Sequence, residues 1–230
     1  MIREPASALV LDFGGVVTKT LFETHDLTEK SLGLAPGTLT WQGPFAPETD
    51  PLWQAMIRDE ITEREYWLRR AREVGALLGE NWEQMDAFVR RARGADPNAV
   101  IRPEALAAIR KVKESGHRLA ILSNELDLFY GEDFRKRLAF IDLFDVIVDA
   151  TYTNILKPDP RAYAFVTDAL SLPASACVFV DDQPRNIKGG IASGMRCVEF
   201  DVRRPEASYT EALSHFGLEL TDHSNQLTGT

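Results

Sequence analysis

Cysteine and histidine are scarce in this chain, which has two cysteines and four histidines among its 230 residues. Both cysteines, Cys177 and Cys197, lie inside apolar strand-like runs, which favours small core residues over a disulfide or a redox pair. The spacing of Cys and His also does not resemble that of a zinc site. The sequence therefore argues against thiol redox chemistry and against a structural zinc ion.

Long apolar runs are missing as well. The longest, such as residues 8–11 and 146–148, fall far short of the roughly 20 residues that a membrane-spanning helix needs. The N-terminus has no basic flank followed by the apolar stretch of a signal peptide. We therefore expect a cytoplasmic protein that does not engage a membrane.

Basic residues are outnumbered: 26 Lys and Arg stand against 35 Asp and Glu, a formal net charge of −9. Proteins that bind nucleic acid gain affinity by neutralising phosphates, so this balance argues against a nucleic-acid partner. A small-molecule substrate is the alternative that we expect. The sequence leaves the oligomeric state open between a monomer and a homodimer.

What the sequence does contain is an alternation of short apolar runs and helical stretches in its C-terminal half. This alternation is typical of a parallel sheet with helices on both faces, and it predicts a doubly wound α/β fold, Rossmann-like in its layers. The predicted strands are residues 8–13, 118–123, 145–149, 177–181 and 196–200. The predicted helices of this part are residues 103–115, 160–170 and 184–193.

Between the first two predicted strands lies a segment without any β-type run. It contains helical stretches at residues 51–59, 62–74 and 81–93. The chain is too short for two full domains but long enough for one domain with an insertion. We therefore expect an α/β core of residues 1–17 and 99–217, a helical cap of residues 18–98, and a disordered polar tail of residues 218–230.

Residues suited to chemistry lie at the ends of predicted strands or in the loops that follow them, in four places along the chain. They are Asp12 with Gly14 and Gly15, then Ser123 and Asn124, then Lys157, and finally Asp181 and Asp182. The carboxyl ends of parallel strands meet at one edge of a sheet, so we expect these groups to share a site. Carboxylates supply hard oxygens for Mg²⁺, Lys157 supplies positive charge, and Ser123 supplies a donor. Each group alone could be a cap or a turn residue, but their order and spacing together favour a site.

With these motifs the sequence resembles the haloacid dehalogenase superfamily, whose members are mostly Mg²⁺-dependent phosphatases, here with a helical cap of the C1 type. The resemblance implies that Asp12 attacks phosphorus to form an aspartyl-phosphate and that Asp181 is the main protein carboxylate on Mg²⁺. The implied catalytic residues are Asp12, Ser123 and Lys157. The implied substrate-binding residues are Gly15, Ser123, Lys157 and Asn124 through its backbone. The implied metal ligands are Asp12, the Gly14 carbonyl, Asp181, and Asp182 directly or through water.

The sequence departs from the family at Gly14, where its phosphatases usually carry a second Asp that acts as general acid and base. Such catalysis contributes about 10²- to 10⁴-fold in rate, so its loss requires another proton donor or a better leaving group. Sugar 1-phosphates and acyl phosphates would meet that requirement. A subset of the family with Asp-x-Gly at this motif acts on sugar 1-phosphates, and this sequence resembles that subset too. His25 and Glu23 are further candidates for the missing proton donor.

Gly14 also leaves two other functions open. Haloacid dehalogenases lack the second Asp as well, and their nucleophile attacks carbon without a metal. The pair Asp181 and Asp182 argues against this alternative, because unneutralised carboxylates beside Asp12 would repel an anionic haloacid. The other alternative is a catalytically weakened protein that binds a phosphorylated ligand or a protein partner as a sensor.

Two smaller expectations concern the cap and a turn. Arginines at positions 64, 69, 70 and 72 alternate with glutamates, which is typical of a solvated helix face, although one of them could bind a substrate anion. Asn154 stands where relatives commonly have glycine before the motif lysine. Because Asn tolerates a left-handed backbone, we expect that turn to be preserved.

Overall fold

The computed structural model describes residues 5–93 and 96–220, which form two compact units. The core unit comprises Met1–Thr18, Ile101–Asn124 and Phe140–Thr230, and the helical unit comprises Lys19–Val100 and Glu125–Ala139. The sequence prediction did not assign residues 125–139 to the insertion. Most of the predicted polar tail, from residue 221 onward, lies outside the described residues.

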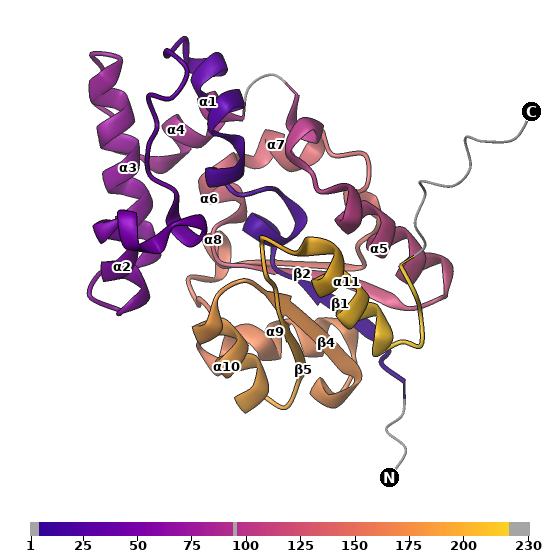
Figure 1. Ribbon diagram of the computed structural model, residues 1–230. Helices are drawn as coiled ribbons and strands as arrows, with labels where there is room; N and C mark the ends of the chain where they lie inside the picture. The colour runs from indigo at the N-terminus through magenta and orange to yellow at the C-terminus, as the bar shows by residue number, and fades with distance from the viewer. Residues whose placement is uncertain (1–4, 94–95, 221–230) are drawn as a thin grey trace, which may run out of the picture. The chain divides into compact units, whose positions relative to one another are not determined.

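A parallel sheet of five strands forms the centre of the core unit (Figure 1). Its strands are β1 (Ala8–Leu11), β2 (Arg118–Ser123), β3 (Val146–Asp149), β4 (Cys177–Asp181) and β5 (Arg196–Glu199). They are ordered β3-β2-β1-β4-β5, so the chain adds strands first on one side of β1 and then on the other. This topology confirms the predicted doubly wound α/β fold.

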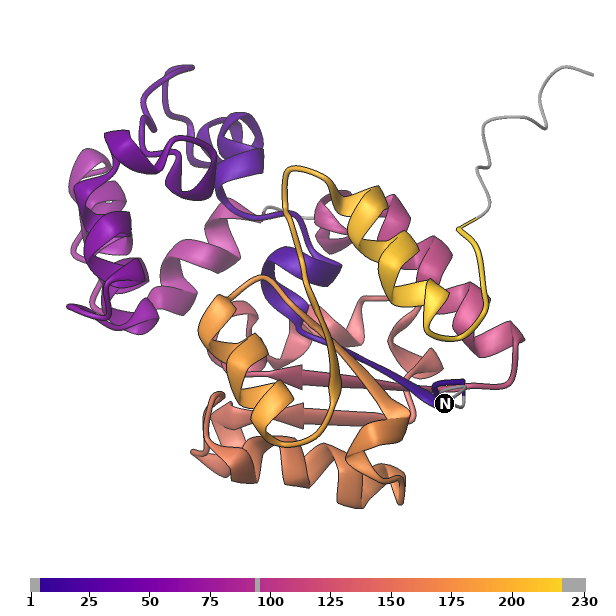
Figure 2. The ribbon, with the colours of Figure 1, turned by 60° about the horizontal axis from the view of Figure 1, so that its bottom comes forward.

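Helices cover both faces of this sheet (Figure 2). One layer contains α5 (Pro103–Glu114) and α11 (Pro205–Ser214), which pack against each other. The opposite layer contains α9 (Pro160–Leu170) and α10 (Pro184–Ala192). Each of these four helices begins with proline, whose missing N–H costs nothing in the first turn. The short helix α8 (Ala150–Thr153) follows β3 and ends at Asn154, whose φ of 56° confirms the expected left-handed turn.

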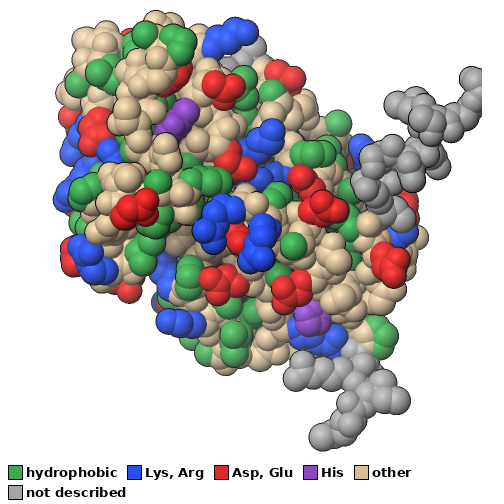
Figure 3. Space-filling model, in the orientation of Figure 1, with side chains coloured by type: hydrophobic (Ala, Val, Ile, Leu, Met, Phe, Trp, Pro, Cys, Tyr) green, Lys and Arg blue, Asp and Glu red, His purple; other side chains and the backbone are tan. Residues whose placement is uncertain are grey.

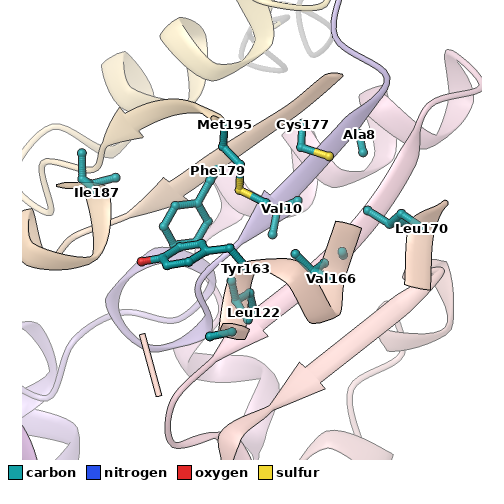
Figure 4. Close-up of a cluster of buried hydrophobic side chains, with 12 residues drawn as sticks. Ala8, Val10, Leu122, Tyr163, Val166, Leu170, Cys177, Phe179, Ile187 and Met195 are labelled. Atoms are coloured by element: carbon teal, nitrogen blue, oxygen red, sulfur yellow. The ribbon is translucent and has the colours of Figure 1, made fainter. Parts of the chain in front are cut away.

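Alternate residues of the central strands fill the core beneath α9 and α10 (Figure 4). Val10, Leu122 and Phe179 point toward Tyr163 and Val166 of α9, and the rings of Tyr163 and Phe179 meet edge to face at 5.5 Å. A slip of one residue in any strand would turn these side chains to the other face. The packing therefore fixes the strand register, and with it the place where each strand ends.

The helical unit is built around aromatic side chains. Its helices are α1 (His25–Leu32), α2 (Pro51–Ile57), α3 (Glu63–Leu77), α4 (Met85–Ala92), α6 (Leu126–Tyr130) and α7 (Glu132–Lys136). Phe22 lies at the centre of a cluster, within 5.2 to 6.2 Å of the rings of Trp41, Trp53, Tyr66 and Trp67. Aromatic pairs at such distances add to the stability that burial alone provides.

The longest helix of the described residues, α3, has 15 residues, and none of their helices combines the length and apolarity that a membrane span requires. The face of the molecule in Figure 3 carries acidic and basic side chains interspersed with one another. The chain also contains exposed ion pairs close in sequence, such as Arg58 with Glu60. Exposed pairs of this kind contribute little to stability.

Candidate active site

Asp12 immediately follows β1, and its backbone N–H donates to the Val180 carbonyl of β4 at 2.9 Å. The chain then turns tightly through Phe13–Val17, so β1 ends two residues earlier than predicted. Gly15 has a φ of 83°, a conformation in which a side chain would be strained. We call residues 12–18 the Asp12 loop. The two glycines let this loop bend away at once, which leaves Asp12 at the carboxyl edge of the sheet.

Lys157 joins two of the strand ends. Its Nζ donates to Asp12 Oδ1 at 2.7 Å, to Asp181 Oδ2 at 2.6 Å and to the Leu122 carbonyl at 2.7 Å. The Lys157 side chain is 1 % exposed, whereas that of Asp12 is 13 % exposed. The ammonium group is therefore buried with all three of its protons donated, and Asp12 still reaches the surface.

Two opposing effects act on the charge of Lys157. Burial by itself would lower the pKa of this ammonium group, but the adjacent negative charges of Asp12 and Asp181 outweigh it, and the pKa lies above its ordinary value. Lys157 thus stays protonated throughout the physiological range. It can fix and neutralise carboxylates, but it is a poor source of a proton for a leaving group.

Asp181 is fully buried, and each of its oxygens accepts two hydrogen bonds. Oδ1 accepts from the Gln183 N–H at 2.8 Å and from Asn186 Nδ2 at 3.0 Å. Oδ2 accepts from Lys157 Nζ and from Asn186 Nδ2, the latter at 3.1 Å. Because a carboxylate offers about four acceptor sites, protein donors already fill those of Asp181. The expectation that Asp181 is the main metal ligand stays a prediction, and in this structure its carboxylate holds Lys157.

Asn124 and Ser123 lie where β2 ends, and both are buried. The Asn124 side chain accepts from the Lys157 N–H at 2.7 Å and donates to the Lys157 carbonyl at 3.1 Å. Sequence reasoning assigned Asn124 a role through its backbone alone and did not foresee that its side chain fixes Lys157. The same reasoning missed Asn186, because its spacing from Asp181 follows no general pattern.

The remaining predicted ligands are the Gly14 carbonyl and Asp182, which follows β4 directly and is half-buried. Among the described residues, no group of three or more His, Cys, Asp and Glu side chains lies close enough to hold a metal ion. Mg²⁺ needs fewer protein ligands than that, since it usually takes one or two carboxylates and completes its shell with water and phosphate oxygens. Asp12, Gly14 and Asp182 together offer such a set of oxygen donors. The chemistry of these oxygen donors therefore fits Mg²⁺.

The two candidate proton donors, His25 and Glu23, belong to the helical unit and not to the core unit that holds Asp12. Glu23 accepts hydrogen bonds from the backbone N–H and the hydroxyl of Thr20. The His25 ring packs edge to face on Trp41 at 4.4 Å, and its Nε2 is buried without a hydrogen-bond partner among the residues that the structure describes. Burial lowers the pKa of His25 below its ordinary value. A neutral imidazole results, which is unsuited to giving up a proton near neutral pH.

The four arginines of α3 are each paired within the helical unit. Their partners are Glu125 for Arg64, Glu65 for Arg69, Asp50 for Arg70 and Glu83 for Arg72. Only Arg70 is buried, where its guanidinium also lies over the rings of Trp41 and Tyr66. The prediction of a solvated face is therefore wrong for Arg70.

Comparison with known proteins adds a family match to this geometry. Residues 6–194 match the family model described as haloacid dehalogenase-like hydrolase. Acyl-CoA dehydrogenase family member 10 of Mus musculus is 33% identical over 217 residues, which cover 93% of this chain and 20% of that protein. Phosphatase MT3486 of Mycobacterium tuberculosis is 30% identical over 134 residues, which cover 58% of each protein. The chain thus spans a fifth and about three fifths of the lengths of these two relatives.

Among solved structures, YfnB of Bacillus subtilis bound to magnesium superposes with a TM-score of 0.60 at 16% identity. The superposition covers 86% of this chain and 87% of YfnB. At this level of identity the likeness concerns the fold alone.

Proposed function

This chain belongs to the haloacid dehalogenase-like hydrolases, and we propose that it is a Mg²⁺-dependent phosphatase that hydrolyses small phosphorylated metabolites through an aspartyl-phosphate on Asp12. The observation that carries the proposal is the buried ammonium of Lys157, bonded to both Asp12 and Asp181. It holds the Asp12 carboxylate in one orientation while leaving that side chain partly exposed to a substrate. A phosphatase of Mycobacterium tuberculosis among the relatives supports the same reaction.

The charges around Asp12 favour this function over dehalogenation without a metal. Asp12, Asp181 and Asp182 carry more negative charge than Lys157 neutralises, so an anionic substrate would be repelled. A divalent cation removes that obstacle for a phosphate ester. A metal-free dehalogenase would have to bind its anionic haloacid beside the same negative charges without the help of a cation.

The metal ligands that we propose are Asp12, the Gly14 carbonyl and Asp182. Asp181 would instead hold Lys157, since its oxygens already accept from protein donors. When bound, Mg²⁺ supplies positive charge that offsets the charge on the phosphoryl oxygens. YfnB, which shares this fold, was solved with bound magnesium.

In the proposed reaction, a carboxylate oxygen of Asp12 forms a bond to phosphorus while the bond from phosphorus to the leaving oxygen breaks. The Ser123 hydroxyl and the backbone N–H of Asn124 bind the phosphoryl oxygens, and Lys157 fixes the nucleophile. The backbone N–H of Gly15, which donates to Thr18 Oγ1 at 3.4 Å in this structure, would have to leave that weak contact to join them. Water then cleaves the aspartyl-phosphate, which releases inorganic phosphate and restores the Asp12 carboxylate. The leaving oxygen departs as an anion or takes its proton from water, because residue 14 carries no carboxyl group.

The test of this proposal is the variant Asp12→Asn, assayed with an activated aryl phosphate and Mg²⁺. We expect phosphate release to fall by at least about 10³-fold, because an amide is a poor nucleophile. Asp145→Asn is the matched control, since Asp145 precedes β3 and pairs with Lys113 and Arg118, away from the carboxyl ends of the strands. Unchanged turnover in Asp12→Asn would sink the proposal.

The absence of an acid at residue 14 further suggests acyl phosphates and sugar 1-phosphates as substrates. In a panel that also contains sugar 6-phosphates, we expect these two classes to be hydrolysed about 10²- to 10⁴-fold faster, the usual contribution of general acid catalysis. Equal rates across the panel would contradict this preference. Halide release from a 2-haloacid in the presence of a chelator would instead support the dehalogenase, and binding of phosphate without turnover would support the sensor.

A further inference from the structure

Arg102 is a buried arginine that contacts the backbone of the Asp12 loop. It is 2 % exposed, its Nε donates to the Gly15 carbonyl at 3.0 Å, and its backbone N–H donates to the Val17 carbonyl at 3.0 Å. It precedes Pro103, the first residue of α5, and the neighbouring Ile101 pairs with Thr18 in an antiparallel bridge. The start of α5 is thereby fastened to the end of the loop.

Tyr209 reaches the same loop from α11. It is fully buried, its hydroxyl donates to the Val16 carbonyl at 3.1 Å, and its ring packs against Phe200 at 5.2 Å. The Arg102 guanidinium lies over the Phe200 ring, 5.5 Å from its centroid. Burial raises the pKa of Tyr209 well above its ordinary value, so the phenol stays protonated and remains a donor.

Four backbone carbonyls of the Asp12 loop thus accept hydrogen bonds. Thr18 N–H donates to Phe13, Arg102 Nε to Gly15, Tyr209 to Val16, and Arg102 N–H to Val17. The carbonyl between those of Phe13 and Gly15 belongs to Gly14. That carbonyl is the one for which we propose a metal, and it lies between Asp12 and the tied residues in the sequence.

Packing alone does not explain a buried guanidinium at this position. Taking a charged group out of water is costly, and well-packed apolar residues often replace buried charges without loss of stability. A donor aimed at a specific carbonyl, in contrast, fixes the backbone in one conformation. Groups that hold metal ligands and nucleophiles in place usually affect the reaction much more than the fold.

We propose that Arg102 and Tyr209 are positioning residues that hold the Asp12 loop so that the Asp12 carboxylate and the Gly14 carbonyl face the substrate side of the sheet edge. The inference rests on the proposed phosphatase function and deepens it. Neither side chain touches the substrate, and both act through the backbone of residues 15–17.

The decisive variant is Tyr209→Phe, which removes one oxygen atom and keeps the ring in the core. We expect kcat to fall about 10-fold with KM changed less than about twofold, because the nucleophile is displaced while the rest of the site stays intact. The affinity for Mg²⁺, measured by calorimetric titration without substrate, should also fall about 10-fold.

The matched control is Ser208→Ala, on the same helix. The Ser208 hydroxyl is buried, accepts from Asp201 N–H at 3.0 Å and donates to the Arg204 carbonyl at 3.3 Å, without a contact to the loop. We expect Ser208→Ala to lower the unfolding temperature as much as Tyr209→Phe but to leave kcat and Mg²⁺ affinity unchanged. If the two variants match in kcat and Mg²⁺ affinity, the positioning role is wrong.

Arg102 provides a second comparison. Arg102→Met should lower kcat about 100-fold, and Arg102→Lys, which keeps the charge and a donor, should recover part of that loss. Equal loss in both variants, with folding intact, would contradict a role for the donor. Failure of the proposed function has a different signature, since wild-type protein would then neither bind Mg²⁺ nor release phosphate.

Discussion

Both units of this protein bury charged side chains, but they arrange them differently. In the core unit, Lys157 and Arg102 contact the proposed nucleophile Asp12 and its loop, and the Asp12 side chain stays partly exposed. In the helical unit, Asp50 accepts from the Trp53 N–H, the Tyr66 hydroxyl and Arg70, all of them buried. The first arrangement presents a reactive group, whereas the second ties α2 to α3. Removing a buried charge should therefore lower kcat/KM in the core unit and the free energy of unfolding in the helical unit.

The largest effect should come from Lys157→Met. Removing the ammonium leaves the carboxylates of Asp12 and Asp181 without their shared cation, and it frees the Asp12 side chain to rotate. We expect kcat/KM to fall by about 10³-fold or more, measured where circular dichroism shows the variant to be folded.

Lys113→Met tests whether the position of the lysine matters. Lys113 also pairs with an aspartate, Asp145, at 3.0 Å, but this pair lies where β3 begins. We expect wild-type kcat/KM. A comparable loss of rate in both variants would mean that the rate does not depend on the strand-end contacts of Lys157.

The helical unit should respond to Asp50→Ala with a loss of stability. The substitution removes the cap of α2 and leaves the buried Arg70 and Tyr66 without their shared acceptor. Breaking a buried ion pair in this way costs about 3–5 kcal/mol. All four tryptophans, at positions 41, 53, 67 and 82, lie in this unit, so tryptophan fluorescence during urea unfolding measures its stability selectively.

The control for this measurement is Glu60→Ala, which removes an exposed pair with Arg58 in the same unit. Exposed pairs of this kind contribute little, so its unfolding curve should overlay that of the wild type. If Asp50→Ala unfolds like Glu60→Ala, the buried cluster does not stabilise the helical unit.

Asn186→Ala probes the contact that sequence reasoning missed. Its Nδ2 donates to both oxygens of Asp181, so its loss should loosen Asp181 and, through it, Lys157. We expect kcat to fall about 10-fold, the lower end of what supporting hydrogen bonds around a metal site contribute. Steady-state kinetics with an aryl phosphate measures this, and an unchanged kcat would show that Lys157 and the Gln183 N–H hold Asp181 without Asn186.

The sequence was sufficient for the fold of the core unit because its strands end in polar residues that a parallel sheet must bring to one edge. The sequence did not predict the contacts that hold the Asp12 loop. Arg102 and Tyr209 reach the Asp12 loop across 87 and 193 residues of chain, and no local spacing encodes such contacts. Short helices such as α6 and α7, of five residues each, are also too brief for a periodic pattern to reveal.

The adjacent residues Asp181 and Asp182 show the same limit of prediction from sequence. Asp181 and Asp182 are adjacent in sequence and chemically identical, so the motif alone cannot tell which one turns inward. Burial decides this, since Asp181 is fully buried and bonded to Lys157 whereas Asp182 is half-buried. Which of the two carboxylates binds a metal ion stays a prediction, and packing distinguishes them only by burial and by the contact with Lys157.

The smallest effect should appear in the helical unit on mild acidification. Burial lowers the pKa of His25 in the folded protein, although the charges of Glu29 and Asp26 partly oppose this. The unfolded chain then binds the proton more tightly, so the stability that His25 contributes is complete above its unfolded pKa of 6.5 and declines as the pH falls below it. Tryptophan fluorescence should therefore report a lower unfolding temperature at about pH 5.5 than at about pH 7.5.

His25→Phe keeps a ring against Trp41 and removes the titrating group, so the decline should be smaller in this variant. Parallel declines in the two proteins would assign the effect to other groups. Glu29 is not one of them in this range, because its hydrogen bonds from Leu39 and Gly37 keep its pKa below its ordinary value of 4.5.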